Sequence, residues 1–483
     1  MKKNIFYLLL LIITSTACNK QLEEHPKSIA TETFYNTPAE VEAALNAIYV
    51  PLKDGNCMGS LYPAQLESYG DYIWGRGSYG PLNDYQGLDN TNSTRVGQMW
   101  QLFYRSIANA NVCLQKIPSA ADVSDAQKLQ YEAEARFLRG FVYFTMAKNW
   151  GGVVLRTEEN IDSINVGRSS VEATYDLAMS DLKFAEANLP ATPRLIGAPY
   201  TNAVKAVLAE FYLVLGDWQN ARNEAAEIIN SGSFSLVPVS TASDFNKIFG
   251  PNVVTTSEEV FYLKYSRQGS NYGFVYPMFE HAPGDGHHGA GGYYAHYTDT
   301  VLNPVMKEWD NNDLRKQYNW YPWNIGLGVN TLLPNKFSDP AATNANNAGN
   351  DYPLYKYSDI LLYYAEAESR VNNGPDAAAM EALNKVHRRA YGYDANQTSP
   401  VDFQLGNYNA QTFINLVATE RNYETCNEAK RWLDLKRMGT VKEAIAKGKG
   451  ATVADKMLLW PIPTVELTYN TAIDPVKDQN PGY

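Results

Sequence analysis

Residues 206–229, AVLAEFYLVLGDWQNARNEAAEII, carry the clearest fold signal in the sequence. Their pattern predicts two helices joined by a tight Leu-Gly-Asp turn at 215–217. Small residues recur at Ala209, Ala221 and Ala225, where two helices of a hairpin would touch. The stretch therefore predicts a helical hairpin with close contact between its helices.

A second stretch, SDILLYYAEAESRVNNGPDAAAMEALNKV at 358–386, repeats this plan. Ala365 lies in the first helix, a Gly-Pro turn follows at 374–375, and Ala378 and Ala382 lie in the second helix. Helix, turn and helix with alanines at the contacts are typical of tetratricopeptide (TPR) repeats. An unrelated alanine-rich hairpin is the alternative. Further helices are expected at 38–50, 95–117, 124–149, 170–188, 201–231, 376–390 and 411–437.

Two segments break the helical pattern. Residues 55–92 and 233–350 are rich in Gly, Pro, Asn and aromatic residues, and only 259–265 has the pattern of a strand. The expected fold is therefore mainly α: a TPR-like helix-turn-helix scaffold, about 38–231 and 357–437, with a large loop-rich insertion that carries a few short strands. We expect one domain over 18–483, with the ligand region in the two aromatic-rich segments.

The N-terminus has the form of a secretory signal. Lys2 and Lys3 precede an apolar run at 5–13, and small residues at 15–17 precede Cys18. The run is shorter than the ~20 residues of a membrane-spanning helix. The pattern resembles a bacterial lipoprotein signal peptide at 1–17, with lipid attached to Cys18; an ordinary signal peptide is the alternative. Glu-Glu at 23–24 resembles a surface-export signal, which places the protein on the outer membrane, facing the cell exterior.

Composition limits the function classes. Lys+Arg is 41 and Asp+Glu is 52, giving a net charge of −11, which argues against nucleic-acid binding. Tyr 34, Trp 9 and Phe 17 make the chain rich in aromatic residues. Tyr and Trp suit contact surfaces that stay wet, because each has an apolar face and a polar edge. Beyond Cys18, the cysteines Cys57, Cys113 and Cys426 are expected to be buried, without a disulfide, redox or metal role.

The sequence carries no G-x-S-x-G, H-E-x-x-H or Walker motif. HAPGDGHH at 281–288 is the one metal-like cluster, and its Gly-rich spacing favours a plain loop over a metal site. We therefore expect no catalytic residues, no metal and no cofactor.

Three carboxylates recur at helical spacing near the C-terminus. Glu420, Glu424 and Glu428 would share one helix face, with Arg421 and Arg431 within pairing reach. This spacing favours an ion-paired structural stripe over a carboxylate site.

The aromatic segments hold the candidate ligand-binding residues. An aromatic ring can stack on the apolar face of a sugar while nearby polar groups bond its hydroxyls. The alternative is that most of these rings fill the core of a loop-rich region. The candidates are Asp71, Trp74, Arg76, Tyr79, Asn83, Tyr293, Tyr294, Trp320 and Trp323.

Several motifs together resemble the SusD/RagB family of Bacteroidetes outer-membrane nutrient-binding lipoproteins. EARFLRGFVYFTMAKNWGGVVL (134–155) resembles a family helix that leads into an aromatic-Gly-x-Val-Pro-Leu strand, with Val154 in place of Pro. In the motif at 420–439, Thr425 replaces a Leu of the family pattern and Ala429 replaces a Gly, and Ala is expected to favour a helix at that position. The motifs run in family order and are YKYSDILLYYAEAESR (355–370), LNKVHRRA (383–390), ERNYETCNEAKRWLDLKRMG (420–439) and the tail LWPIPTVEL…QNPGY (459–483).

The resemblance implies a glycan-binding protein that is lipid-anchored in the outer membrane and passes its ligand to a SusC-like TonB-dependent transporter. It also implies that the motif residues hold the helical scaffold together and that ligand lies on the early loop and the insertion. Three alternatives remain open: a surface protein that binds peptide or another nutrient, a glycan-degrading enzyme, and a TPR scaffold for other proteins.

Overall fold

Helices make up most of the computed structural model, which describes residues 34–268 and 273–483. The signal peptide expected at 1–17 and Cys18 lie outside these ranges. Within them, no helix combines the length and the apolar character needed to cross a membrane. The helices before the insertion are α2 (Pro38–Lys53), α3 (Leu61–Glu67), α4 (Asn90–Lys116), α5 (Asp125–Trp150), α6 (Val171–Asn188), α7 (Thr201–Leu215) and α8 (Trp218–Asn230).

Side-chain caps fix where these helices begin. Thr37 and Glu40 form a capping box at the start of α2, and Ser124 and Gln127 form another at α5. Gly216 ends α7 at φ 76°, a left-handed conformation that Gly adopts without strain. Helix α8 begins two residues after Gly216, at Trp218, so the turn of this hairpin is short.

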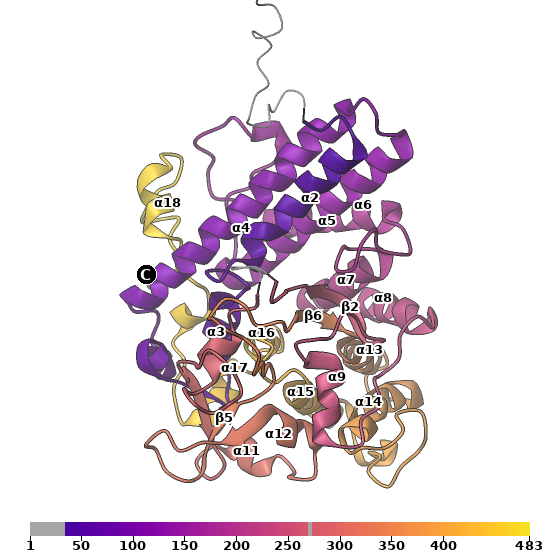
Figure 1. The fold of residues 1–483 in the computed structure, drawn as a ribbon, viewed down its shortest axis with the longest axis vertical. Helices are drawn as coiled ribbons and strands as arrows, with labels where there is room; N and C mark the ends of the chain where they lie inside the picture. The colour runs from indigo at the N-terminus through magenta and orange to yellow at the C-terminus, as the bar shows by residue number, and fades with distance from the viewer. Residues whose placement is uncertain (1–33, 269–272) are drawn as a thin grey trace, which may run out of the picture.

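The two hairpins recognised in the sequence pack against each other. Helix α8 contacts α7 on one side and α13 (Tyr357–Val371) on the other, and α13 also packs on α14 (Ala377–Ala390). Figure 1 shows α8 and α13 side by side, although about 126 residues separate them in the chain. The contact alanines are buried as expected, except that Ala379 is buried in place of the exposed Ala378. The mainly α fold with TPR-like hairpins is confirmed.

The insertion leaves the scaffold after α8 and returns at α13. Strands β2 (Glu259–Leu263) and β6 (Tyr352–Lys356) pair antiparallel and close its base. A second sheet has the order β1-β3-β5-β4, with β1 (Trp74–Gly75), β3 (His296–Asp299), β4 (Trp320–Pro322) and β5 (Thr331–Pro334). This sheet lies at the opposite end of the molecule from α2 and α6 (Figure 1). The insertion's helices are α9 (Asn246–Phe249), α10 (Pro277–Glu280), α11 (Pro304–Glu308) and α12 (Leu314–Asn319).

The C-terminal region differs from expectation in one element. The helix expected at 411–437 is two helices, α15 (Ala410–Glu424) and α16 (Arg431–Arg437). Asn427 and Ala429 break it, because both have a positive φ, 61° and 64°. The expectation that Ala429 favours a helix is wrong, since the position needs the left-handed conformation that Gly adopts most easily. The chain ends with α17 (Val441–Lys449) and α18 (Thr464–Tyr469).

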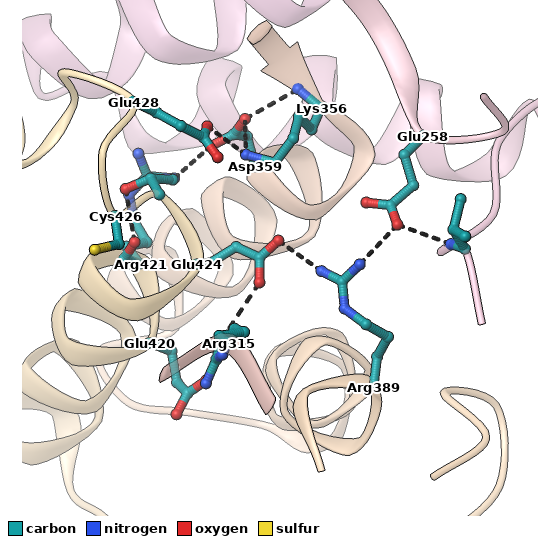
Figure 2. A network of polar contacts seen from close by, with 12 residues as sticks. Glu258, Arg315, Lys356, Asp359, Arg389, Glu420, Arg421, Glu424, Cys426 and Glu428 are labelled. Carbon is teal, nitrogen blue, oxygen red and sulfur yellow. Dashed lines mark hydrogen bonds and ion pairs between the residues drawn. The ribbon is translucent and has the colours of Figure 1, made fainter. Parts of the chain in front are cut away.

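The carboxylates at 420–428 are buried in a network of ion pairs (Figure 2). Arg389 is held between Glu258 at 2.7 Å and Glu424 at 2.6 Å. Glu428 forms ion pairs with Lys336 and Lys356, each at 2.5 Å. Glu420 bonds Arg315 at 2.9 Å and lies 3.0 Å from His387.

The structural role expected for these carboxylates is confirmed, but the arrangement is not the expected one. Glu428 lies beyond the end of α15 and does not share its face. Arg421 pairs with Asp434 and Arg431 with Asp71, not with the glutamates nearby in sequence. Cys57, Cys113 and Cys426 are free and buried, as expected.

Removing the charge of Glu428 should destabilise the protein strongly. Burial raises the pKa of Glu428, but Lys336, Lys356 and Lys430 outweigh it and lower the pKa to about 2. We expect Glu428→Gln to cost about 3–5 kcal/mol in urea unfolding, because Lys336 remains buried without a counter-charge and Lys356 keeps only Asp359, at 3.6 Å.

The same carboxylate should make stability depend on acid pH. A folded-state pKa of about 2 lies below the ordinary value of 4.5, so the contribution is present above pH ~4.5 and is lost as pH falls toward 2. The wild type should therefore lose more stability over this window than Glu428→Gln does. The exposed Glu159→Gln should match wild type throughout; equal acid sensitivity of all three proteins would contradict the assignment.

Ala429→Gly should not destabilise the protein. Relief of the left-handed strain, about 1–2 kcal/mol, offsets the lost methyl burial and the added chain entropy. We expect unfolding free energy to stay level or to rise by up to about 1 kcal/mol. As a control, Ala365→Gly in the interior of α13 should cost about 1 kcal/mol or more. Similar losses at both positions would show that residue 429 is helical.

Candidate functional site

The β1-β3-β5-β4 sheet aligns aromatic residues along one face. Trp74 is paired with Tyr297, Thr298 with Leu332, and Tyr321 with Leu333. The register therefore places Leu333 between Tyr297 and Tyr321. Since paired residues project to the same side of a sheet, Trp74, Tyr297, Leu333 and Tyr321 share one face.

Neighbouring residues along the same strands project to the other face. Trp320 packs there in a buried cluster with Tyr72 and Ile73, and its ring meets Tyr72 edge-on at 6.0 Å. Only 5% of Trp320 is exposed. The sheet thus separates Trp320 from Trp74.

We define the aromatic face as Trp74, Tyr294, Tyr297, Tyr321 and Trp323. Trp74 stacks on Tyr297 with centroids 5.7 Å apart and planes 25° from parallel. Tyr321 and Trp323 lie 6.3 Å apart, and Tyr294, Tyr297 and Trp323 pack as partly buried residues around Tyr321. The face combines half-exposed ring surface with a buried foundation, the form expected of a surface that stacks on a ligand.

Polar groups lie around the aromatic face. The Arg76 guanidinium sits over the Tyr294 ring at 4.0 Å. The Tyr321 hydroxyl donates to Asp285. Burial is the largest cause that raises the pKa of Tyr321, and the Asp285 carboxylate raises it further. The His287 ring lies 4.1 Å from the Tyr321 ring and is tilted 37° to it. Burial lowers the pKa of His287, so its imidazole is neutral at pH 7.

Backbone geometry fixes the loop that carries Trp74 and Arg76. A Cβ on Gly75 would lie 2.5 Å from the carbonyl oxygen of Tyr79, so the turn accepts only Gly. The Asn83 amide bonds both the N–H and the C=O of Gly75, at 3.0 and 2.8 Å. Opposite this loop, Tyr294 adopts a positive φ of 37°, a strained conformation for a residue with a side chain.

One family model, described as "Starch-binding associating with outer membrane", matches residues 20–213, and the SusD family model matches 289–483. The chain belongs to the SusD/RagB family.

Full-length relatives agree with this assignment. SusD-like protein P2 of Formosa agariphila is 26% identical over 522 residues and covers all of both chains, and SusD-like protein P25 of the same organism is 25% identical, with 100% of this chain and 99% of its own covered. A SusD homolog from Bacteroides thetaiotaomicron has the same fold, with a TM-score of 0.78, 22% identity, and 95% and 99% of the two chains covered.

The SusD fold brings part of the predicted site together. Trp74, Arg76, Tyr294 and Trp323 lie on or beside the aromatic face. Tyr293 is 59% exposed and touches Phe279 edge-on at 6.0 Å.

Four other candidates are engaged within the protein. Asp71 is buried and paired with Arg431 at 2.6 Å. Tyr79 is buried beneath Arg95, and Trp320 lies in the core on the far side of the sheet. The Asn83 amide is occupied by Gly75. These four side chains contact other parts of the protein, and none of them belongs to the aromatic face.

The candidate set omitted Tyr297, Tyr321 and His287. Strand alternation carries the missing signal: in the run Trp-Tyr-Pro-Trp at 320–323, positions 321 and 323 share a side and 320 takes the other. No strand is expected at 320–323 from the sequence alone, so strand alternation could not be used to separate Trp320 from Tyr321 and Trp323. His287 was considered only as a metal ligand.

The histidines at 281–288 form a stack of rings. His281 lies 5.6 Å from His287 and 6.5 Å from His288, with planes 21° and 23° apart. Burial lowers the pKa of His281 to about 3, so it is neutral. In the ranges that the structure describes, no group of three or more His, Cys, Asp or Glu residues is placed to hold a metal ion.

A buried Ser-His-Glu arrangement lies behind the sheet. His296 Nε2 is 2.8 Å from Ser68 Oγ, and Nδ1 is 2.8 Å from Glu280. All three side chains are at most 2% exposed, and the Ser68 hydroxyl donates to the carbonyl of Ala64 at 2.8 Å. The hydroxyl has no open side for a substrate, so the arrangement ties β3 to the end of α3.

Replacing Trp320 and Trp323 by Ala should have opposite effects. Trp320→Ala empties a core position and should cost about 3–5 kcal/mol of unfolding free energy. Trp323→Ala removes a half-buried ring from the aromatic face and should leave the melting temperature nearly unchanged. Thermal unfolding of both variants checks this. A large loss for Trp323→Ala with none for Trp320→Ala would invert the two faces of the sheet.

Proposed function

We propose that this protein is a cell-surface lipoprotein that captures oligosaccharide or polysaccharide on the aromatic face and delivers it to a SusC-like TonB-dependent transporter. The main observation behind the proposal is a row of partly exposed rings on one side of the sheet: Trp74 stacks on Tyr297, and Trp323 lies beside the buried Tyr321. Such rings stack on the apolar faces of sugars, while polar edges and neighbours bond hydroxyl groups.

The family supports a glycan ligand. One solved neighbour is named a laminarin-binding SusD-like protein, with a TM-score of 0.73, 20% identity, and 93% of this chain and all of its own covered. Another is surface glycan-binding protein A of Bacteroides fluxus, with a TM-score of 0.74, 21% identity, and 92% and 100% coverage. We extend the glycan-binding role to this chain, without extending laminarin as its ligand.

The N-terminal sequence supports anchoring in the outer membrane. The short apolar run, the small residues and Cys18 fit lipid attachment, with residues 18–483 forming the mature protein. A multiply acylated cysteine holds a protein on a membrane firmly, since each buried CH₂ contributes about 0.8 kcal/mol. A surface anchor suits a protein that captures large glycans outside the cell.

Binding without hydrolysis fits the site. Glycosidases use two carboxyl groups on either side of the scissile bond. Beside the aromatic face, Asp285 is held by the Tyr321 hydroxyl and by the N–H groups of Ala282 and His287. Asp299 is buried and accepts from the N–H groups of Val301 and Leu302. Both carboxylates thus serve the local backbone.

A binding screen on soluble protein beginning after Cys18 tests the proposal. Calorimetry across a glycan panel should find a ligand that is recovered uncut after prolonged incubation. Trp74→Ala and Trp323→Ala should each weaken its binding about five- to tenfold, since one stacking contact contributes on the order of 1 kcal/mol.

The matched control is Trp218→Ala. Trp218 is a half-buried tryptophan of α8 that lies beneath Arg370, away from the aromatic face. Its replacement should leave affinity unchanged. Shortened products that persist through repurification would favour an enzyme. Binding of peptides in place of glycans, or full affinity in both face variants, would also overturn the proposal.

A further inference from the structure

Arg76 is an unusual arginine in this protein. Within the part of the chain that the structure describes, it is half-buried, yet its guanidinium makes no ion pair and no hydrogen bond. Arg105 shares this lack of partners, but it is exposed on α4. Buried and half-buried arginines elsewhere are satisfied by carboxylates or carbonyls, as Arg168 is by three backbone oxygens. Arg76 therefore keeps its donors free at the candidate site.

The position of this free cation is fixed. The Arg76 guanidinium lies 4.0 Å from the centre of the Tyr294 ring, and its backbone N–H donates to the Ala295 carbonyl at 2.7 Å. Burial raises the pKa of Tyr297, and the Arg76 charge opposes that rise. The charge thus acts on the same ring that stacks with Trp74. A guanidinium ordered on an aromatic ring loses little freedom when it binds an anion.

Neighbouring carboxylates do not neutralise Arg76. Asp285 and Asp299 each accept from backbone N–H groups of their own loops, and Asp285 also accepts from the Tyr321 hydroxyl of β4. The net charge of the chain is −11, so the protein as a whole repels anions. An anionic ligand would therefore depend on a local cation, and the aromatic face has one whose five N–H donors are unoccupied.

We propose that the preferred ligand carries an anionic group, a carboxylate or a sulfate on a sugar ring, and that Arg76 binds it through two parallel N–H···O contacts while Trp74 and Trp323 stack on the sugars. This inference rests on the proposed function and specifies its substrate class. The planar fork of arginine matches two oxygens of a carboxylate or sulfate, and such charge-assisted pairs are stronger than bonds to neutral hydroxyls.

Matched pairs of oligosaccharides test the inference by calorimetry. One arm compares oligogalacturonides and alginate oligosaccharides with their carboxyl-reduced forms. The other arm compares sulfated galactan oligosaccharides with their desulfated forms. We expect the acidic member of at least one pair to bind about 10- to 100-fold more tightly than its neutral partner. The preference should shrink as NaCl is raised, and the arm that shows it identifies carboxylate or sulfate.

Variants assign the preference to one side chain. Arg76→Gln should abolish the difference within the pair, and Arg76→Lys should restore part of it. Arg105→Gln makes the same change in net charge at an exposed site and should behave as wild type.

Two results would overturn the inference in different ways. If neutral members bind as tightly as acidic ones, or if the preference survives Arg76→Gln, the anionic ligand is wrong while glycan binding stands. If wild type binds no member of any pair and no neutral glycan in the screen, the proposed function itself fails.

Discussion

Buried ion pairs join the C-terminal motif at 420–439 to the insertion and to the helices around it. Glu428 holds Lys336 from the insertion and Lys356 from β6, and all three side chains are at most 2% exposed. Glu424 holds Arg389 of α14, which also binds Glu258 at the base of the insertion (Figure 2). Each of these charges is tolerated in the interior only while its partner is present, because an unpaired buried charge is strongly destabilising. The network therefore fixes the insertion against the scaffold in one arrangement.

This constraint reaches the candidate site through one strand. Lys336 lies two residues beyond the end of β5, the strand between β3 and β4. Leu333 of β5 is fully buried beneath Tyr297 and Tyr321. Holding Lys336 therefore holds the strand that supports the rings. A family motif more than 80 residues away in the chain positions the aromatic face without contributing a residue to it.

The sequence predicts those features of the fold that depend on residues close together in the chain. Alanine spacing, with the turn at Gly216 in one hairpin and the Gly-Pro turn at 374–375 in the other, located both hairpins, because helix period and turn residues depend on adjacent residues. It failed where the outcome depends on pairing between distant strands. Trp320 and Trp323 have similar neighbours in sequence, yet one is in the core and the other on the aromatic face. Alternation along β4 decides between them, and a three-residue strand flanked by loops has too little pattern to predict. The prediction that Ala429 favours a helix failed for a related reason, because its positive φ follows from the path that the chain takes from α15 to α16.

Short strands explain why the site is so heavily supported from behind. Strands of two to four residues have little stability of their own. Here Tyr294 N–H donates to the His281 carbonyl at 3.0 Å, and Ala295 N–H donates to Phe279 at 2.7 Å. Buried His296 anchors β3 from below, and strained Tyr294 stays in place because this surrounding structure outweighs its cost. Rings and guanidinium are thus ordered before any ligand arrives. Because these groups are already ordered, a ligand that binds the aromatic face would cost little ordering entropy.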